Sequence, residues 1–177
     1  FGLISGAIMA VMMFATLPFL EKIGFNKGLV VGYTTMILAF MLVFFGIRSY
    51  RENVSGGRIT FGRAFAVGIL ITLVACACYV VAWEILYFKF MPDFVDKYAS
   101  YMIEKVRASG ASQQVIDAKL QEMKSFKAMY DNPFINAAIT FTEPFPIGLI
   151  ITLISAAILR KKTIIATVDD GRPAQLQ

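Results

Sequence analysis

Two carboxylates in apolar surroundings are the residues of this chain with the clearest capacity for chemistry. Glu143 lies in the short sequence Thr142-Glu143-Pro144-Phe145-Pro146, and Glu84 lies near the end of another apolar run. A charged group inside a membrane-spanning segment is costly, so such residues are often functional. The sequence therefore offers one candidate intramembrane polar site, made of Glu84, Thr142, Glu143, Pro144 and Pro146.

The two prolines allow two structures around Glu143, because each removes a helical hydrogen bond and Pro144 disfavours the helical conformation of the residue before it. In the structure we favour, a membrane helix begins here, with Thr142 as its cap and Glu143 at the positive, partly hydrated helix end. In the alternative, the helix is broken inside the membrane, and Glu143 and freed carbonyl groups line a polar cavity. The depth of Glu84, near the outer interface, favours solvation or pairing with a lysine.

Several common kinds of catalytic and metal site are excluded by the sequence itself. The chain has no histidine, which rules out Ser-His-Asp and Cys-His catalysis and removes the commonest metal ligand. No phosphate-binding glycine loop occurs. Cys76 and Cys78 would point about 200° apart on a helix, so we interpret them as small core residues. We therefore expect no enzymatic activity, no cofactor and no metal.

Four long apolar runs must position the candidate site. They cover about residues 1–20, 28–47, 64–88 and 134–159, and each approaches or exceeds the roughly 20 residues that a helix needs to cross a bilayer. Continuous runs are typical of helices rather than of barrel strands. The composition, 58% hydrophobic and only 16% charged, agrees. The sequence predicts an all-α, integral membrane four-helix bundle over residues 1–163, followed by a tail at 164–177.

Basic residues beside the runs indicate the orientation. One cluster lies between the second and third runs and another ends the fourth run; together they comprise Arg48, Arg51, Arg58, Arg63, Arg160, Lys161 and Lys162. Two spans separate the clusters, so both lie on one side, which we expect to be cytoplasmic together with both termini. The net charge of +5 then reflects contacts with anionic headgroups or a protein partner, not nucleic acid.

The longest segment outside the runs, residues 92–132, predicts an external amphipathic helical hairpin. Apolar side chains recur every three or four residues on both sides of a break at 109–112. They are Phe94, Tyr98, Met102 and Val106 before it, and Ile116, Leu120, Met123, Phe126 and Tyr130 after it. We expect the two stripes to cover each other and the outer mouth of the bundle. A groove for a protein partner and a helix lying on lipid are alternatives.

Small residues and aromatic residues predict how the spans pack. Small residues recur every four positions in three runs: Gly2, Gly6 and Ala10; Gly28 and Gly32; Ala64, Gly68, Thr72 and Cys76. Such seams allow close approach of helices, within the chain or between copies in a homo-oligomer. Tyr79, Trp83 and Tyr87 are expected in the aromatic belt at the outer interface.

The stretch from residue 48 to 68 carries a family resemblance. Its most specific part is Gly56-Gly57-Arg58-Ile59-Thr60-Phe61-Gly62-Arg63-Ala64-Phe65, by which the chain resembles domain of unknown function 4199, an uncharacterised family of four-span inner-membrane proteins of Gram-negative bacteria. The resemblance runs from the first span to Lys162 and implies this fold and location, but no reaction or ligand. Physically, Gly56 and Gly57 would turn the chain, and Ile59, Phe61 and Phe65 would enter the interface.

These observations favour a non-enzymatic accessory or scaffold protein of the bacterial inner membrane. The alternative is a small oligomeric transporter or channel for an ion or small solute, using Glu143 and Glu84.

Overall fold

The computed structural model of the protein describes residues 1–160, apart from the side chain of Glu21, so the predicted contacts of Lys161 and Lys162 and the tail at 164–177 lie outside the described residues. Over this range the chain is all-α and contains no strand. Four helical segments are long and apolar enough to cross a membrane: Gly2–Phe19, Phe25–Asn53, Phe61–Phe90 and Pro133–Leu159. The predicted fold class is confirmed.

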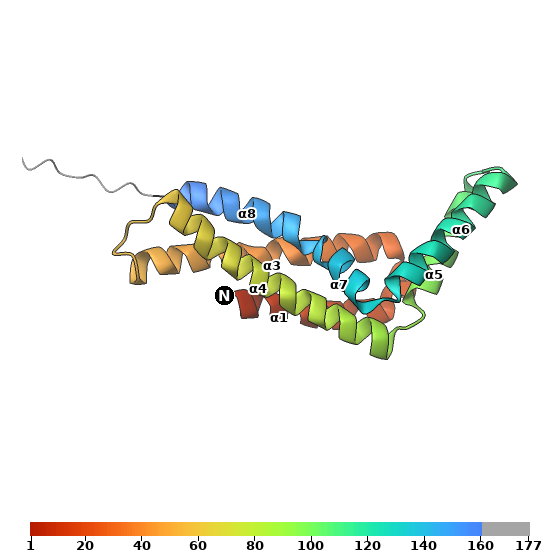
Figure 1. Ribbon diagram of the computed structural model, residues 1–177, viewed down its shortest axis with the longest axis horizontal. Helices are drawn as coiled ribbons and strands as arrows, with labels where there is room; N and C mark the ends of the chain where they lie inside the picture. Colours follow the sequence, from red (N-terminus) through yellow and green to blue (C-terminus); the bar gives the residue numbers. More distant parts are fainter. Residues whose placement is uncertain (161–177) are drawn as a thin grey trace, which may run out of the picture.

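The bundle is formed by α1 (Gly2–Thr16), α3 (Phe25–Asn53), α4 (Phe61–Ile85) and α8 (Pro144–Leu159). A 3₁₀ turn, η1 (Leu17–Phe19), and the short α2 (Leu20–Ile23) join α1 to α3. The central helices are α3 and α4, because α1 and α8 each pack against both of them (Figure 1).

The two ends of the bundle differ in construction. At one end, which we call the arginine end, residues 54–60 link α3 to α4 and α8 terminates. Gly56 and Gly57 have φ angles of 62° and 81°, so the predicted glycine turn is present and needs the left-handed conformation that glycine adopts freely. Ile59, however, is buried in the core and does not extend into the interface as we predicted.

At the other end, the hairpin end, the chain leaves the bundle through η2 (Leu86–Phe90), a π-helical turn that continues α4. The hairpin follows as α5 (Phe94–Ala108) and α6 (Gln113–Tyr130), and α7 (Pro133–Phe141) returns the chain to the bundle. The hairpin projects away from the spans at an angle (Figure 1). Its base contacts the bundle through rings such as Phe94, which lies 5.0 Å from Trp83 between ring centroids.

The two hairpin helices pack against each other through the predicted stripes. Ile116, Met123 and Tyr130 are buried, and the stripe residues of α5 are partly buried. The break at residues 109–112 is a turn in which Gly110 has φ 76°, as helix C-termini often require.

Close helix packing characterises the arginine end and the middle of the bundle. A Cβ atom added to Gly148 would lie 2.5 Å from Thr72 Cγ2, and one added to Gly68 would lie 2.7 Å from Thr152 Cγ2. At Gly6 the added atom would lie 2.4 Å from Cys78 Cβ. The seams of α1 and α4 therefore serve packing within the chain, while homo-oligomerisation stays a prediction.

Candidate functional site

The fourth apolar segment is a broken helix, which corrects the structure that we favoured from the sequence. The helix begins at Pro133, nine residues before Thr142, and Asn132 is its N-cap: Asn132 Oδ1 accepts from the backbone N–H of Phe134 at 3.0 Å. This is the capping arrangement that we predicted at Thr142 and Pro144. Thr142 does not cap α8; its hydroxyl donates to the carbonyl of Ile139 at 2.6 Å.

The break itself follows from local backbone geometry. The N–H of Glu143 bonds back to the carbonyl of Thr140 at 3.3 Å, a tightened last turn of α7, and Pro144 then opens α8 without an N–H of its own. The interruption of the alternative structure is therefore observed, with Thr142 and Glu143 both in the αR conformation, whereas carbonyl groups that line a polar cavity stay a prediction.

Three side chains spaced four residues apart on α4 and its continuation η2 hold the broken segment, and we call them the aromatic ladder: Tyr79, Trp83 and Tyr87. The Tyr79 hydroxyl donates to Glu143 Oε2 at 2.9 Å, Trp83 Nε1 donates to Asn136 Oδ1 at 3.0 Å, and the Tyr87 hydroxyl donates to Asp131 Oδ1 at 2.7 Å. The spacing places all three on one helix face.

The aromatic ladder corrects our prediction of an aromatic belt. Tyr79, Trp83 and Tyr87 are 9%, 7% and 1% exposed, so their rings face other helices rather than lipid headgroups. The physical reason is that each polar atom finds a partner on α7 or at either end of it, and a buried donor with a partner avoids the desolvation cost of an unpaired one.

Asn136 is the hub of a second layer of hydrogen bonds. It is fully buried, its Nδ2 donates to the carbonyl of Tyr130 at 3.1 Å, and its Oδ1 also accepts from the Thr140 hydroxyl at 3.2 Å. The Thr140 and Tyr130 hydroxyls lie 3.4 Å apart. Burial raises the pKa of Tyr130, which keeps that hydroxyl protonated as a donor. The sequence carried a signal for Asn136 that we missed: an amide seven residues before Glu143, two helical turns away on one face.

A cavity of about 310 Å³ opens beside the aromatic ladder, between α1, α3, α4 and the base of the hairpin. Four methionines and eight aromatic residues contribute to its lining, and Glu143 lies in the wall with its carboxyl group bonded to Tyr79. Among the described lining residues, Glu143 is the one with a charged side chain. Gly32 helps to make the space, because a Cβ atom added there would meet nothing within 4 Å.

The structure places the predicted site residues in different surroundings. Glu143 lines the cavity and is exposed, Thr142 and Pro146 are also exposed, and Pro144 is buried in the bundle. Glu84 is partly buried outside the cavity wall, and within residues 1–160 its Oε1 atom has no hydrogen-bond partner. Glu84 and Glu143 therefore do not share the lining of this cavity among the described residues, and a joint site stays a prediction.

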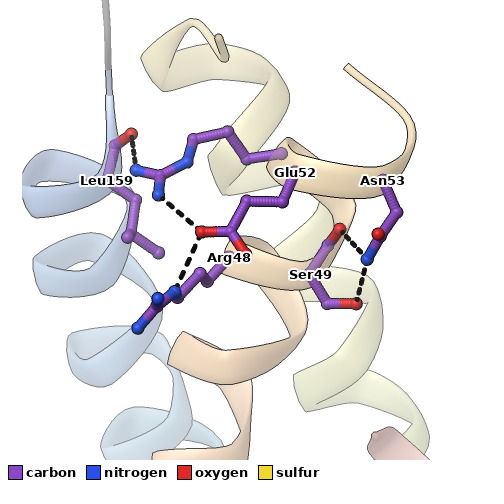
Figure 2. Close-up of polar contacts among 6 residues, drawn as sticks. Arg48, Ser49, Glu52, Asn53 and Leu159 are labelled. Atoms are coloured by element: carbon purple, nitrogen blue, oxygen red, sulfur yellow. Dashed lines mark hydrogen bonds and ion pairs between the residues drawn. The ribbon is translucent and has the colours of Figure 1, made fainter. Parts of the chain in front are cut away.

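The predicted basic site at the arginine end divides into two kinds of residue. Because α3 continues to Asn53, six residues beyond the predicted run, Arg48 and Arg51 lie on its last turns. Figure 2 shows the Glu52 carboxylate beside Arg48, whose Nε atom is 3.0 Å from Oε1. Arg51 Nη2 is also 3.0 Å from the same oxygen. Arg51 Nη1 also donates to the carbonyl of Leu159 at 3.3 Å.

This geometry gives Arg51 a structural task. Its side chain is only 13% exposed, against 53% for Arg48, and it satisfies a carbonyl at the C-terminus of α8, where a cation is favourable. Arg58, Arg63 and Arg160 are exposed, so their predicted headgroup contacts stay predictions.

Comparison with known proteins identifies a family and no function. Residues 1–161 match the family model described as "Protein of unknown function (DUF4199)". No curated protein and no solved structure matches the chain. Within residues 1–160, no group of three or more His, Cys, Asp or Glu side chains is placed to hold a metal ion.

Proposed function

The chain belongs to the DUF4199 family of proteins of unknown function, and we propose that it is a non-enzymatic multi-pass membrane protein that binds a small amphipathic molecule. The observation that carries this proposal is the cavity of about 310 Å³ in whose apolar and aromatic wall Glu143 is, among the described residues, the one with a carboxyl group. Mostly apolar pockets of this size with a few fixed polar groups are typical of small-molecule sites.

Binding accounts for the geometry better than transport across the bundle. Beyond Glu143 toward the arginine end, Phe40, Val43 and Ile47 are completely buried, and Gly148 and Gly68 are in van der Waals contact with their neighbours. The polar side chains at this level bond to each other, as in the 3.0 Å contact between the Thr72 and Thr152 hydroxyls. The cavity thus ends against a packed core, which supports an accessory role with a ligand site.

The orientation belongs to the same proposal. The density of arginines beside the spans supports an orientation with both termini cytoplasmic, and the family resemblance supports the bacterial inner membrane as the location. The hairpin would then face the outside. A single cysteine at Ser112, in a chain with Cys76 and Cys78 replaced by alanine, should react with an impermeant reagent in intact spheroplasts. Reaction only after membrane disruption would reverse the orientation.

The binding function can be tested with Trp83, the one tryptophan of the chain, which lines the cavity. The probe is N-phenyl-1-naphthylamine, an uncharged apolar dye that accepts energy from tryptophan, added to protein in an uncharged detergent. We expect a saturable component of energy transfer that is lost in Gly32→Leu, which fills the cavity, and kept in Gly62→Leu. Gly62 is a matched control, because it too is helical and a Cβ atom there meets nothing within 4 Å. Transfer without a saturable component would refute the binding function.

A further inference from the structure

We infer that the ligand is an organic ammonium ion on a small apolar body, held by the Glu143 carboxylate and the aromatic rings around it. The inference rests on the binding function proposed above and names the chemical class of the ligand. It follows from three properties of the cavity wall: its charge, the kind of surface that its rings present, and the absence of a counter-charge.

The charge of the wall is that of Glu143. The residue is fixed at the break between α7 and α8, and its Oε2 atom accepts from Tyr79 at 2.9 Å. A carboxylate oxygen accepts several hydrogen bonds, so this bond leaves acceptor capacity for a ligand. In a mostly apolar wall a cation is the partner that best compensates the charge, because Coulomb attraction increases as water is excluded.

The rings supply the second element of cation recognition. Trp83 and Tyr130 stand at 69° to each other with centroids 6.5 Å apart, and both line the cavity near Glu143 together with Tyr79. Aromatic faces attract ammonium groups through their quadrupole, and aromatic cages commonly recognise alkylated ammonium ions. The methionines of α1, Met9, Met12 and Met13, offer flexible apolar surface for the remainder of the ligand.

The wall also argues against an anion or a zwitterion. None of the described residues that line the cavity is lysine or arginine, so the phosphate of a phospholipid headgroup would have no cationic partner there. Lys97 lines a separate, smaller cavity at the base of the hairpin and forms an ion pair with Asp93 at 2.9 Å. The occupant that fits is a free monocation rather than a zwitterionic lipid.

The test uses a matched pair of ligands that differ only in charge. Benzyltrimethylammonium and neopentylbenzene have the same shape, with a quaternary nitrogen in one and a quaternary carbon in the other. Each is used to displace N-phenyl-1-naphthylamine from the protein in an uncharged detergent with phosphatidylglycerol added. The variants are Glu143→Gln and the matched control Glu84→Gln. The control removes a carboxylate that does not line the cavity.

We expect Glu143→Gln to raise the half-displacement concentration of the cation about tenfold, on the scale of one desolvated charge contact, and to change that of neopentylbenzene less than about twofold. Glu84→Gln should change neither. Saturable dye binding in Glu143→Gln shows that the variant is folded, and Tyr79→Phe, which retains the carboxylate, should retain the preference for the cation.

Several results would overturn the inference while leaving the binding function intact. Equal effects of Glu143→Gln on both ligands, or no effect on the cation, would mean that the carboxylate does not recognise charge. Loss of the saturable dye signal when phosphatidylethanolamine replaces phosphatidylglycerol would assign the site to a lipid headgroup instead. Absence of saturable dye binding in the parent protein is the separate result that refutes the binding function.

Discussion

The packed middle of this bundle and its hairpin end use glycine for opposite purposes. Gly148 on α8 lies where an added Cβ would be 2.5 Å from Thr72 and 2.9 Å from Phe40, so glycine there brings helices together. Gly32 on α3 lies where an added Cβ meets nothing within 4 Å, so glycine there leaves space in the cavity wall. The same residue type on two spans therefore serves packing in one region and a ligand site in the other.

The comparison extends to polar groups. Near the middle of the bundle the Thr72 and Thr152 hydroxyls bond to each other, and Ser5 donates to the carbonyl of Ala39 at 2.9 Å. In these bonds both partners belong to the bundle helices. At the hairpin end the aromatic ladder leaves Glu143 in the wall of an open cavity. We infer that the arginine end supplies most of the stability of the spans and that the hairpin end supplies recognition.

The largest effect should come from placing one side chain at both glycines. Gly148→Leu overpacks the closest helix crossing, and we expect a loss of about 3 kcal/mol or more in stability. Gly32→Leu should leave stability unchanged, because the cavity receives the side chain. Thermal unfolding in detergent, followed by Trp83 fluorescence, measures both. Equal losses in the two variants would contradict the division into packed and open ends.

The hairpin should be separable from the bundle. Ile116 is 7% exposed and its neighbour Val115 is 51% exposed, so Ile116→Asp and Val115→Asp introduce the same charge at a buried and an exposed position of α6. We expect Ile116→Asp to cost roughly 2–3 kcal/mol through lost burial alone, opening the hairpin to limited proteolysis. Val115→Asp is the control. Cleavage within the spans, or equal sensitivity of both variants, would show that the hairpin is not an independent layer.

The aromatic ladder should respond to the loss of its central acceptor. Asn136→Leu keeps the size of the side chain but leaves Trp83 Nε1 without its buried partner, which we expect to cost about 1–3 kcal/mol. Because the indole then has no acceptor, its emission should also shift to shorter wavelength. Asn53→Leu, at an exposed position at the arginine end, should change neither quantity. An unchanged spectrum in Asn136→Leu would argue against the ladder.

The smallest effect concerns the surface of the hairpin, where Lys127 pairs with Asp96. The Asp96 carboxylate raises the pKa of Lys127, so any stability from this pair is complete below the ordinary lysine pKa of about 10.4 and is lost as the pH rises through the raised value. We expect Lys127→Met to resemble the parent at neutral pH and moderate salt. Proteolysis rates at pH 7 compared with pH 11 measure this, with Lys124→Met as control. A large loss at neutral pH would mean that the pair holds the hairpin closed.

The sequence predicted elements more successfully than partners. Run length and composition identified the spans, and four-residue periodicity identified the hairpin stripes, because both are local consequences of burial and helix geometry. The identity of the hydrogen-bond partners of Tyr79, Trp83 and Tyr87 does not follow from the local sequence. Their acceptors lie 44 to 64 residues later in the chain, and nothing in α4 itself distinguishes a belt facing lipid from a ladder facing α7.

The helix break shows the same limit in a different form. The prolines at 144 and 146 indicated an interruption, but whether a helix preceded it depended on Asn132 and Pro133, which lie at the boundary between the predicted hairpin and the fourth apolar run. The cavity could not be predicted at all, because an empty volume depends on how the helices around Gly32 are spaced rather than on any residue type.

The π-helical turn η2 determines how far the hairpin is rotated about the axis of α4 relative to the spans. Each residue of an α-helix advances the chain by about 100°, and the wider turn at Leu86–Phe90, closed by a bond from the Met91 N–H to the Leu86 carbonyl at 2.8 Å, accommodates one residue more than an α-turn would. A one-residue deletion there would rotate the base of the hairpin and carry Phe94 and Tyr98 away from the cavity. We therefore expect the number of residues between the bundle and the hairpin to be fixed, and the number in the turn around Gly110 to vary. Insertions and deletions among family members would then show which parts of the protein must keep a fixed rotation relative to each other.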